Sequence, residues 1–471
     1  LEGGVKFNFS EISLPKDCLS QNNDNNEYED LEEDIYDSDN NEEDSKNVLR
    51  TCFKSMVETL SKQAPTTITQ VQLFVKELRR IILLWDELWL GTLAQHHSEI
   101  TRRQAQLELE IEKVNENQNL NREEKISLIT EKHRIIIKPI IYILEQLYEI
   151  TSVEPETPHE ANFQERYLPF IRDVLTKLKN PQNPDKPQES WSYIKMLQQK
   201  FSQKSGNGKR SIYSLKLQDI SPVLFNLKDT VIAMPGLNGS LRKKVFIMQL
   251  ANHVSILPTK TKPKKLIFHG SDGQIYTYLF KGLEDLHLDE RIMQFLSIAN
   301  TMMTQIEDGG RNSNRNMYKA RHYSVIPLGP RSGLISWVDG TTPLFTLYKR
   351  WQQREATKKN ASGPVLRPSD LFYNKLNPLL QKAGVKNMDN RKEWPLSVLK
   401  QVLVELMAET PKDLLAKELW CHSVDAEAWW KVVRNYVYST AVMSVIGYII
   451  GLGDRHLDNV LIDLTSGEVV H

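Results

Sequence analysis

Two polar side chains near the C-terminal end of the sequence have the types and the spacing that phosphoryl transfer needs. Asp454 and Asn459 lie five residues apart in the run Gly451-Leu452-Gly453-Asp454-Arg455-His456-Leu457-Asp458-Asn459. A carboxylate can orient an attacking hydroxyl and accept its proton, and an amide oxygen can bind the magnesium ion that bridges nucleotide phosphates. A surface turn is the alternative for Asp454 taken alone, because Asp is common in turns.

The elements on either side of this run have to hold it in place. Tyr436 to Gly453 is a run of 18 uncharged residues, and Val460-Leu461-Ile462-Asp463 follows the loop. The first segment predicts a buried helix and the second a short strand. The uncharged run is also the one membrane candidate of the sequence, but its Ser, Thr and Gly residues and the polar loop after it favour a buried helix.

A lysine at the end of another predicted strand can hold a nucleotide phosphate. Lys281 closes the run Tyr278-Leu279-Phe280, and Glu284 and Asp289 follow it toward a predicted helix. A lysine ammonium acts as a point charge on a phosphate, and a carboxylate on the next helix can keep that ammonium in place. Taken alone, this motif has an alternative interpretation without a nucleotide, as a strand followed by a charged helix cap.

These two motifs resemble the phosphatidylinositol 3-kinase-related protein kinase family. The family signature G-x-x-D-R-H-x-x-N is matched at Gly451, Asp454, Arg455, His456 and Asn459. The family motif K-x-x-E-D-L-R-x-D-E-R is matched from Lys281 to Arg291, with His287 in place of the usual Arg. The resemblance implies a two-lobed kinase domain, with a strand-rich small lobe and a helical large lobe.

The resemblance also implies ATP and Mg²⁺ (or Mn²⁺) as cofactors, and a nucleotide pocket. Lys281 would contact a phosphate, with Asp289 as its partner. Trp337 would stack on the adenine and Val338 would supply backbone hydrogen bonds, although an ordinary core tryptophan is the alternative for Trp337. The other residues implied to line the pocket are Glu284, Tyr323, Ile326 and Leu461.

The same resemblance assigns roles in the transfer step. Asp454 would orient or deprotonate the substrate hydroxyl, and Asn459 would bind the metal ion. Lys281 would steady the phosphates. Arg455 and His456 would support the loop and the charge that develops during transfer.

Residues 66–203 predict a bundle of about four helices ahead of the kinase domain. The bundle resembles the FRB domain that precedes the catalytic domain in this family, through the stretches Glu77 to Arg80, Leu84 to Trp89, Asn162-Phe163 with Tyr167, and Ser190 to Tyr193. Ordinary core is the alternative for these aromatic side chains. One or two of them would line a groove that recruits substrates.

The predicted fold class is therefore α+β, a helical bundle followed by a kinase domain of the PI3K/PI4K type. Residues 1–65 are predicted to be an N-terminal segment with an acidic, disordered linker from Asp24 to Asp44. Residues 204–338 would form the small lobe and hinge, and residues 339–471 a large lobe truncated at its C-terminal end. A second metal-binding Asp follows in the family, so we expect this chain alone to have little activity.

The composition excludes several classes of protein. Lys and Arg number 60 and Asp and Glu number 60, so the net charge predicts no direct nucleic-acid binding. Cys18, Cys52 and Cys421 lie far apart, which argues against a disulfide framework or a zinc site and fits a reducing compartment. The expected location is cytoplasmic, with the nucleus as a second compartment, and no membrane association is expected.

Several stretches are most similar to the branch of the family that acts in nonsense-mediated mRNA decay, namely Leu347 to Glu355, Leu414 to Trp420, Gly451 to Asn459 and Ile462 to His471. This implies a serine/threonine kinase that modifies Ser or Thr followed by Gln on the RNA helicase of that pathway. It also implies two regulatory subunits and inositol hexakisphosphate as a structural ligand. A lipid kinase and a catalytically dead scaffold are the alternatives, and the intact Lys281, Asp454 and Asn459 argue against the scaffold.

Overall fold

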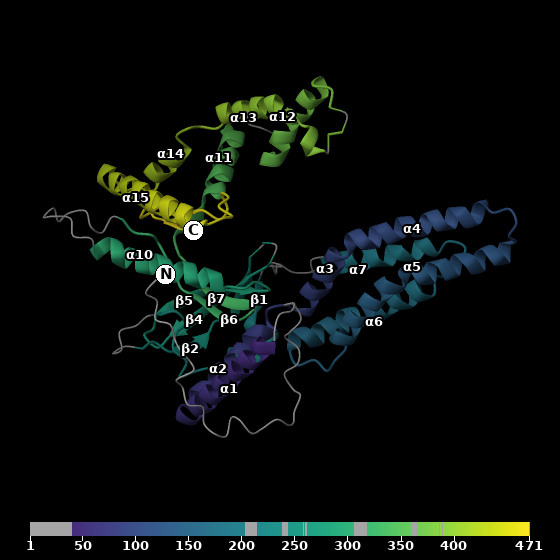
Figure 1. Cartoon of the computed structure of the whole chain (residues 1–471), viewed down its shortest axis with the longest axis horizontal. Coiled ribbons are helices and arrows are strands. Elements are labelled where there is room, and N and C mark those ends of the chain that lie inside the picture. Colours follow the sequence, from purple (N-terminus) through teal and green to yellow (C-terminus); the bar gives the residue numbers. More distant parts are fainter. Residues whose placement is uncertain are drawn as a thin grey trace. The chain divides into compact units, whose positions relative to one another are not determined.

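The computed structural model describes residues 40–202, 214–237, 244–257, 259, 261–305, 318–358, 365–385, 387–388 and 390–470. It divides into two compact units, Leu1–Ile256 with Leu266–Ile275, and Leu257–Lys265 with Tyr276–His471. Figure 1 shows their helices and strands. Residues 24–39 of the predicted acidic linker lie outside the described residues. The disorder predicted for residues 40–44 is wrong, because helix α1 begins at Asn40, and acidic residues are favourable in the first turn of a helix.

The first unit contains a series of helices and then short strands. The helices are α1 (Asn40–Gln63), α2 (Pro65–Arg80), α3 (Trp85–Gln95), α4 (His97–Glu116), α5 (Arg122–Thr151), α6 (Pro158–Lys179), η3 (Pro187–Trp191), α7 (Ser192–Ser202), α8 (Leu217–Ile220) and α9 (Pro222–Asn226). The strands are β1 (Ser214–Lys216), β2 (Ile247–Leu250), β3 (His253–Ile256) and β4 (Lys264–Gly270), of which Lys264 and Lys265 belong to the second unit. β1 pairs antiparallel with β3, and β2 with β4.

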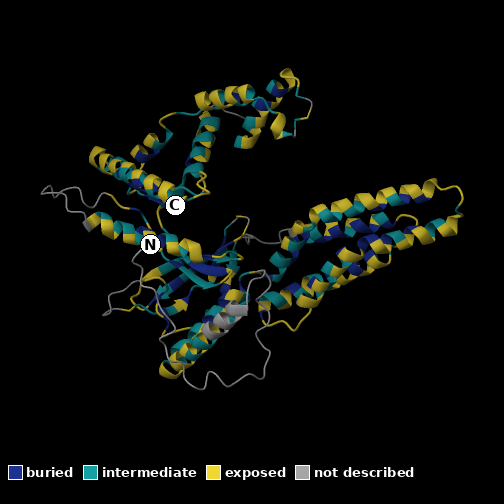
Figure 2. Ribbon diagram, viewed as in Figure 1, coloured by how far each residue is buried: buried dark blue, intermediate teal, exposed yellow. Residues whose placement is uncertain are grey.

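Helices α3 to α7 enclose one apolar core. Asn121 caps α5 by accepting the backbone N–H of Glu124, whose carboxylate accepts the backbone N–H of Asn121 in return. Figure 2 shows buried residues on the inner sides of α4, α5 and α6 and exposed residues on their outer sides. Trp89, Phe163 and Trp191 are all buried in this core. The ordinary-core interpretation is therefore correct for these three aromatic side chains.

Helix α2 packs against residues that lie far away in the sequence. The rings of Phe74 and Phe268 meet edge to face with their centres 6.0 Å apart. Ser221 Oγ donates a hydrogen bond of 2.7 Å to the buried carboxylate of Glu77. The chain leaves the helical conformation between α2 and α3, where Ile81 and Leu84 are buried.

The second unit carries strands that lead into a helical region. Its strands are β5 (Ile275–Gly282), β6 (Val325–Gly329), β7 (Ser332–Ser336), β8 (Thr341–Pro343), β9 (Leu461–Asp463) and β10 (Val469–Val470). Its helices are α10 (His287–Gln305), α11 (Leu344–Lys358), α12 (Pro368–Lys382), η4 (Arg391–Glu393), α13 (Leu396–Glu409), α14 (Leu414–Cys421) and α15 (Ala426–Ile450). β7 pairs antiparallel with both β5 and β6, and β9 lies between β8 and β10. The predicted α+β class is confirmed.

Helix α15 differs from the buried helix that the uncharged run predicts. Val432, Ser439, Val442 and Met443 are buried on one face, but Tyr448 on the other face is 90% exposed. An uncharged sequence has no polar stripe that marks the exposed face, so its pattern could not distinguish a fully buried helix from one that is buried on one face only. No helix in the described part of the chain is long and apolar enough to span a bilayer.

Candidate active site

The loop after α15 brings Asp454 and Asn459 together. Gly451 ends the helix in the left-handed conformation (φ +65°), and the backbone N–H of Leu452 donates to the carbonyl of Gly447 at 2.8 Å. Asp454 is itself left-handed, with φ +56°. Asn459 Nδ2 donates to the backbone oxygen of Asp454 at 3.0 Å and to its carboxylate Oδ2 at 2.9 Å. The two residues that the sequence selects by spacing are therefore in direct contact.

The start of α11 fixes the backbone of this loop. The N–H groups of Leu344 and Phe345 donate to the carbonyls of Val460 and Leu457, both at 3.0 Å. Leu461 begins β9 and is paired with Pro343 of β8. The first N–H groups of a helix have no partner within the helix, so the loop carbonyls satisfy them. The loop is thus held by its own strand and by a helix more than a hundred residues earlier.

Arg455 and His456 form hydrogen bonds with the backbone of the same loop. Arg455 Nε donates to the carbonyl of Gly453 at 2.7 Å, and the N–H of Asp458 donates to His456 Nδ1 at 3.2 Å. His456 Nε2 lies 3.8 Å from the Asp454 carboxylate, whose side chain is 77% exposed. The carboxylate is therefore oriented by its neighbours and open to a substrate from solvent.

Lys281 lies at the end of β5 and forms an ion pair with Glu284, with 3.2 Å between Nζ and Oε2. The predicted pairing of Lys281 with Asp289 is wrong for this structure. The chain turns immediately after Gly282, so the carboxylate that returns to Lys281 is the one three residues later. Glu284 and Lys281 are both about one-third exposed, which leaves the ammonium accessible to a phosphate.

Asp289 instead lies near Tyr323. Burial raises the pKa of the Tyr323 hydroxyl, the Asp289 carboxylate raises it further, and the Arg455 guanidinium lowers it. Tyr323 packs against one apolar cluster that contains Met293 of α10, Val325 of β6 and Val442 of α15. The structure therefore brings the helix that carries Asp289 to the segment that carries Tyr323.

Comparison with known proteins identifies this region. Residues 275–471 match the family described as phosphatidylinositol 3- and 4-kinase. The prediction of the family from the two motifs is confirmed, and the kinase domain contains both of them.

Relatives extend the similarity over most of the chain. It is 51% identical over 435 residues to the serine/threonine-protein kinase SMG1 of Danio rerio, covering 90% of this chain and 12% of that protein. It is 46% identical over 428 residues to Smg1 of Drosophila melanogaster, covering 89% and 13%. A solved structure, the open conformation of CtTel1, aligns with a TM-score of 0.44 and 19% identity over 92% of this chain and 17% of that one. The chain spans about one-eighth of the length of these two kinases.

The predicted adenine-binding residues of the kinase domain lie at the end of β7. The N–H of Trp337 donates to the carbonyl of Thr277 at 2.9 Å, and Thr341 Oγ1 donates to the carbonyl of Val338 at 3.0 Å. Ile326 of β6 is paired with Leu334 of β7. These contacts fix the backbone at the predicted hinge. The contacts of Trp337, Val338, Ile326 and Leu461 with a nucleotide stay predictions.

Sequence reasoning missed residues that only the fold brings to this site. Lys265 Nζ lies 4.0 Å from the centre of the Trp337 ring, as a cation over an aromatic face. Arg321, just before β6, forms an ion pair with Glu468, which lies shortly after the loop of Asp454 and Asn459. Neither pair has a local spacing signal, because its members are widely separated in the sequence.

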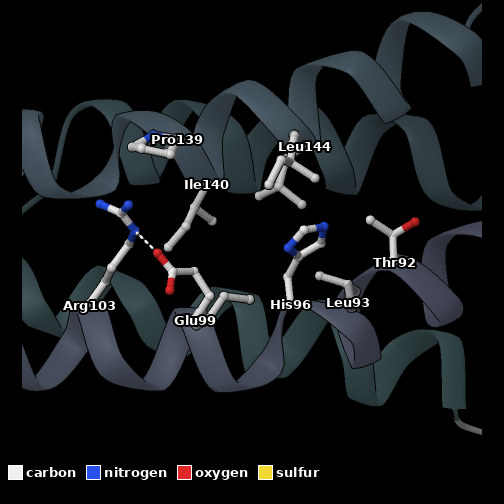
Figure 3. A pocket seen from close by; sticks show the side chains of 10 residues that line it. Thr92, Leu93, His96, Glu99, Arg103, Pro139, Ile140 and Leu144 are labelled. Atoms are coloured by element: carbon white, nitrogen blue, oxygen red, sulfur yellow. Dashed lines mark hydrogen bonds and ion pairs between the residues drawn. The ribbon is translucent and has the colours of Figure 1, made fainter. Parts of the chain in front are cut away.

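A small recess in the bundle lies between α3 and α4 on one side and α5 on the other (Figure 3). Pro139 and His96 line it. Glu99 and Arg103 form an ion pair of 2.6 Å at one end, and Arg103 also donates to the carbonyl of Ile136 at 3.2 Å. The acidic and basic groups here are paired with each other, so the recess offers no second candidate for phosphoryl transfer.

Proposed function

We propose that the chain is the catalytic part of a larger serine/threonine protein kinase, which transfers the γ-phosphoryl group of ATP to Ser or Thr followed by Gln. The observation that carries this proposal is the Asp454–Asn459 pair, in which the amide of one residue holds the carboxylate of the other. Both relatives described above are named as serine/threonine-protein kinases, which supports protein rather than lipid substrates.

The side chains of the chain fit a magnesium or manganese ion. Asn459 uses its amide nitrogen on Asp454, and its amide oxygen is of the atom type that hard divalent cations prefer. Among the residues that the structure describes, no group of three or more His, Cys, Asp or Glu side chains is placed so that it could hold a metal ion. This fits an ion that takes few protein ligands and completes its shell with phosphates and water. When bound, such an ion would neutralise charge on the phosphates.

The residues of the chain would then act as follows. Asp454 accepts the proton of the attacking hydroxyl, and Asn459 keeps its carboxylate aimed. Lys281, held by Glu284, binds a phosphate oxygen as a point charge. Arg455 and His456 hold the loop in shape beside Asp454. In these steps the protein binds the phosphates, orients the attacking hydroxyl and accepts one proton, which is its contribution to phosphoryl transfer.

The same proposal includes the substrate, the partners and the location, and these rest on the family resemblance. The proposed substrate is the RNA helicase of nonsense-mediated mRNA decay. The proposed partners are regulatory subunits and inositol hexakisphosphate, and the proposed location is the cytoplasm or the nucleus. Similarity to the SMG1 kinases over about nine-tenths of the chain supports them.

Two substitutions test the proposal. Lys281→Met should weaken binding of a fluorescent ATP analogue to the chain about tenfold, which corresponds to the loss of about 1.4 kcal/mol. Asp454→Asn should leave that binding unchanged. In the full-length protein, Asp454→Asn should slow transfer to a Ser-Gln peptide by about 100-fold to 10,000-fold, the usual contribution of a general base. Transfer that persists in Asp454→Asn, or that favours phosphatidylinositol over the peptide, would contradict the proposal.

A further inference from the structure

The connection between β5 and α10 contains a leucine in a backbone conformation that leucine rarely adopts. Leu283 has φ +63°, one of four non-glycine residues with positive φ in the described chain, the others being Asp229, Lys262 and Asp454. The left-handed region brings the Cβ of an L-residue too close to its own carbonyl oxygen. The side chain of Leu283 is 53% exposed, so its packing does not account for this conformation.

The connection is short and is fixed at each of its next three residues. Glu284 is paired with Lys281. Asp285 accepts a hydrogen bond of 3.0 Å from the N–H of His287, the first residue of α10. Leu286 is buried in the core of the second unit, and its carbonyl accepts the N–H of Glu290 at 3.0 Å. A chain held at three consecutive positions leaves little freedom at the residue before them.

The left-handed turn is what allows Glu284 to reach Lys281. In a continuing strand, residues three apart lie about 10 Å apart and point to opposite faces of the sheet. The observed separation of 3.2 Å between Lys281 Nζ and Glu284 Oε2 is incompatible with that geometry. The chain must therefore reverse between Gly282 and Glu284, and Leu283 is the residue that takes up the unfavourable dihedral angle.

We infer that Leu283 is a positioning residue for the nucleotide site, and that it acts through its backbone conformation rather than its side chain. It holds Glu284 against Lys281, which keeps the ammonium directed for a phosphate. The expected effect of Leu283 on ATP binding rests on the proposed function. Its effect on the ion pair between Lys281 and Glu284 rests on the geometry alone.

A pair of substitutions separates backbone from side chain. Asn tolerates the left-handed region but is polar, whereas Val is apolar like Leu but is β-branched and disfavours that region strongly. A backbone role predicts that Leu283→Asn keeps nucleotide affinity within twofold and that Leu283→Val weakens it about fivefold to tenfold, corresponding to about 1 kcal/mol. A side-chain contact with the nucleotide predicts the reverse order. A fluorescent ATP analogue titrated into the chain measures both.

Lys262 offers a matched control, because it has φ +46° in the loop between β3 and β4 and is outside the proposed site. Lys262→Val should lower the melting temperature as Leu283→Val does, yet leave nucleotide affinity unchanged. If Leu283→Val also leaves affinity unchanged, or if Lys262→Val weakens it equally, the inference is wrong.

A second measurement needs no nucleotide. Glu284→Gln should change the melting temperature in the original chain and with Leu283→Asn, but have no further effect with Leu283→Val, since the ion pair is already lost there. Additive effects in all three backgrounds would overturn the inference. A chain that binds no ATP analogue would instead contradict the proposed function, and the melting data would still decide the role of Leu283.

Discussion

At the scale of single residues, His133 shows how burial alone controls a charge. Its side chain is 1% exposed in the bundle, and its ring meets that of Trp191 edge to face with centres 6.5 Å apart. Its Nε2 atom has no hydrogen-bond partner in the described structure. Burial lowers the pKa of His133 from 6.5 to about 4, because no neighbouring charge compensates for the lost hydration.

The shift predicts a stability that depends on pH. Below pH 6.5 the unfolded chain takes up a proton at His133 and the folded chain does not, so the free energy of unfolding falls as the pH decreases towards 4. Between pH 7 and pH 5 the loss from this residue is about 2 kcal/mol, at 1.36 kcal/mol per pKa unit. Urea unfolding of the chain and of His133→Phe at both pH values measures it.

The control is His97→Phe, which removes an exposed histidine of the same bundle. It should keep the full loss between pH 7 and pH 5, whereas His133→Phe should lose about 2 kcal/mol less than the original chain. Equal acid sensitivity in all three proteins would show that His133 is protonated as easily in the folded chain as in the unfolded one.

The local spacing that selects Asp454 and Asn459 in the sequence corresponds to a direct contact in the structure, and their roles in catalysis stay predictions. Asp454 and Asn459 are five positions apart, and hydrogen bonds between them close the loop. The choice of Asp289 as the partner of Lys281, which followed from the family motif, is wrong because Glu284 forms that ion pair in the structure. The left-handed conformation of Leu283 does not occur at a typical turn residue such as Gly or Asn, so no sequence pattern predicts it.

At the scale of elements, the hairpin β9–β10 rests directly on helix α15. Ser439 Oγ accepts the N–H of Val469 at 2.9 Å, and Asn435 Nδ2 donates to the carbonyl of Ser466 at 2.9 Å. Gly467 has φ +81°, and a Cβ on it would lie 2.1 Å from the carbonyl oxygen of Val432. The helix and the hairpin that flank the loop of Asp454 and Asn459 are therefore fixed to each other.

Ser439→Ala should destabilise this contact. It leaves the buried N–H of Val469 without a partner, which typically costs about 1–3 kcal/mol. We expect a lower melting temperature and weaker protection of the Val469 amide in hydrogen exchange. Ser444→Ala, at an exposed position of the same helix, should change the free energy of unfolding by less than about 0.5 kcal/mol. Equal effects of the two substitutions would contradict this account of the hairpin.

Helix α15 also shows the limit of sequence patterns at this scale. Its existence and its end at Gly451 follow from the uncharged run and the glycine. Which side is covered does not follow, since Ser439 is buried and Ser444 is exposed with no difference in residue type. The covered face depends on the hairpin and on the residues of α10 and β6 in the cluster around Val442, which lie far from α15 in the sequence.

At the scale of the whole molecule, neighbours in sequence are not always neighbours in space. The predicted boundaries at residues 66 and 203 group α2 with the bundle, and those boundaries stay predictions. Within the first unit, however, Glu77 contacts Ser221, and Gln70 accepts the N–H of Val231 at 2.9 Å. Contacts more than 140 residues apart in the sequence leave no local pattern, so sequence reasoning could not place α2.

These contacts predict what a single cut would do. A protease site placed between residues 203 and 213 would divide the chain into a part with α1 to α7 and a part with β1 to β10. The two parts should stay together on size-exclusion chromatography at micromolar concentration, because Phe74, Glu77 and Gln70 of the first contact Phe268, Ser221 and Val231 of the second. Replacing both Phe74 and Glu77 by Ala removes a buried ring and leaves Ser221 without this partner, so the dissociation constant of the cut chain should rise more than tenfold. Leu73→Ala changes an exposed side chain of the same helix and should have little effect. Separation of the unsubstituted parts at that concentration would mean that α2 does not hold the first unit together and that the linker alone does.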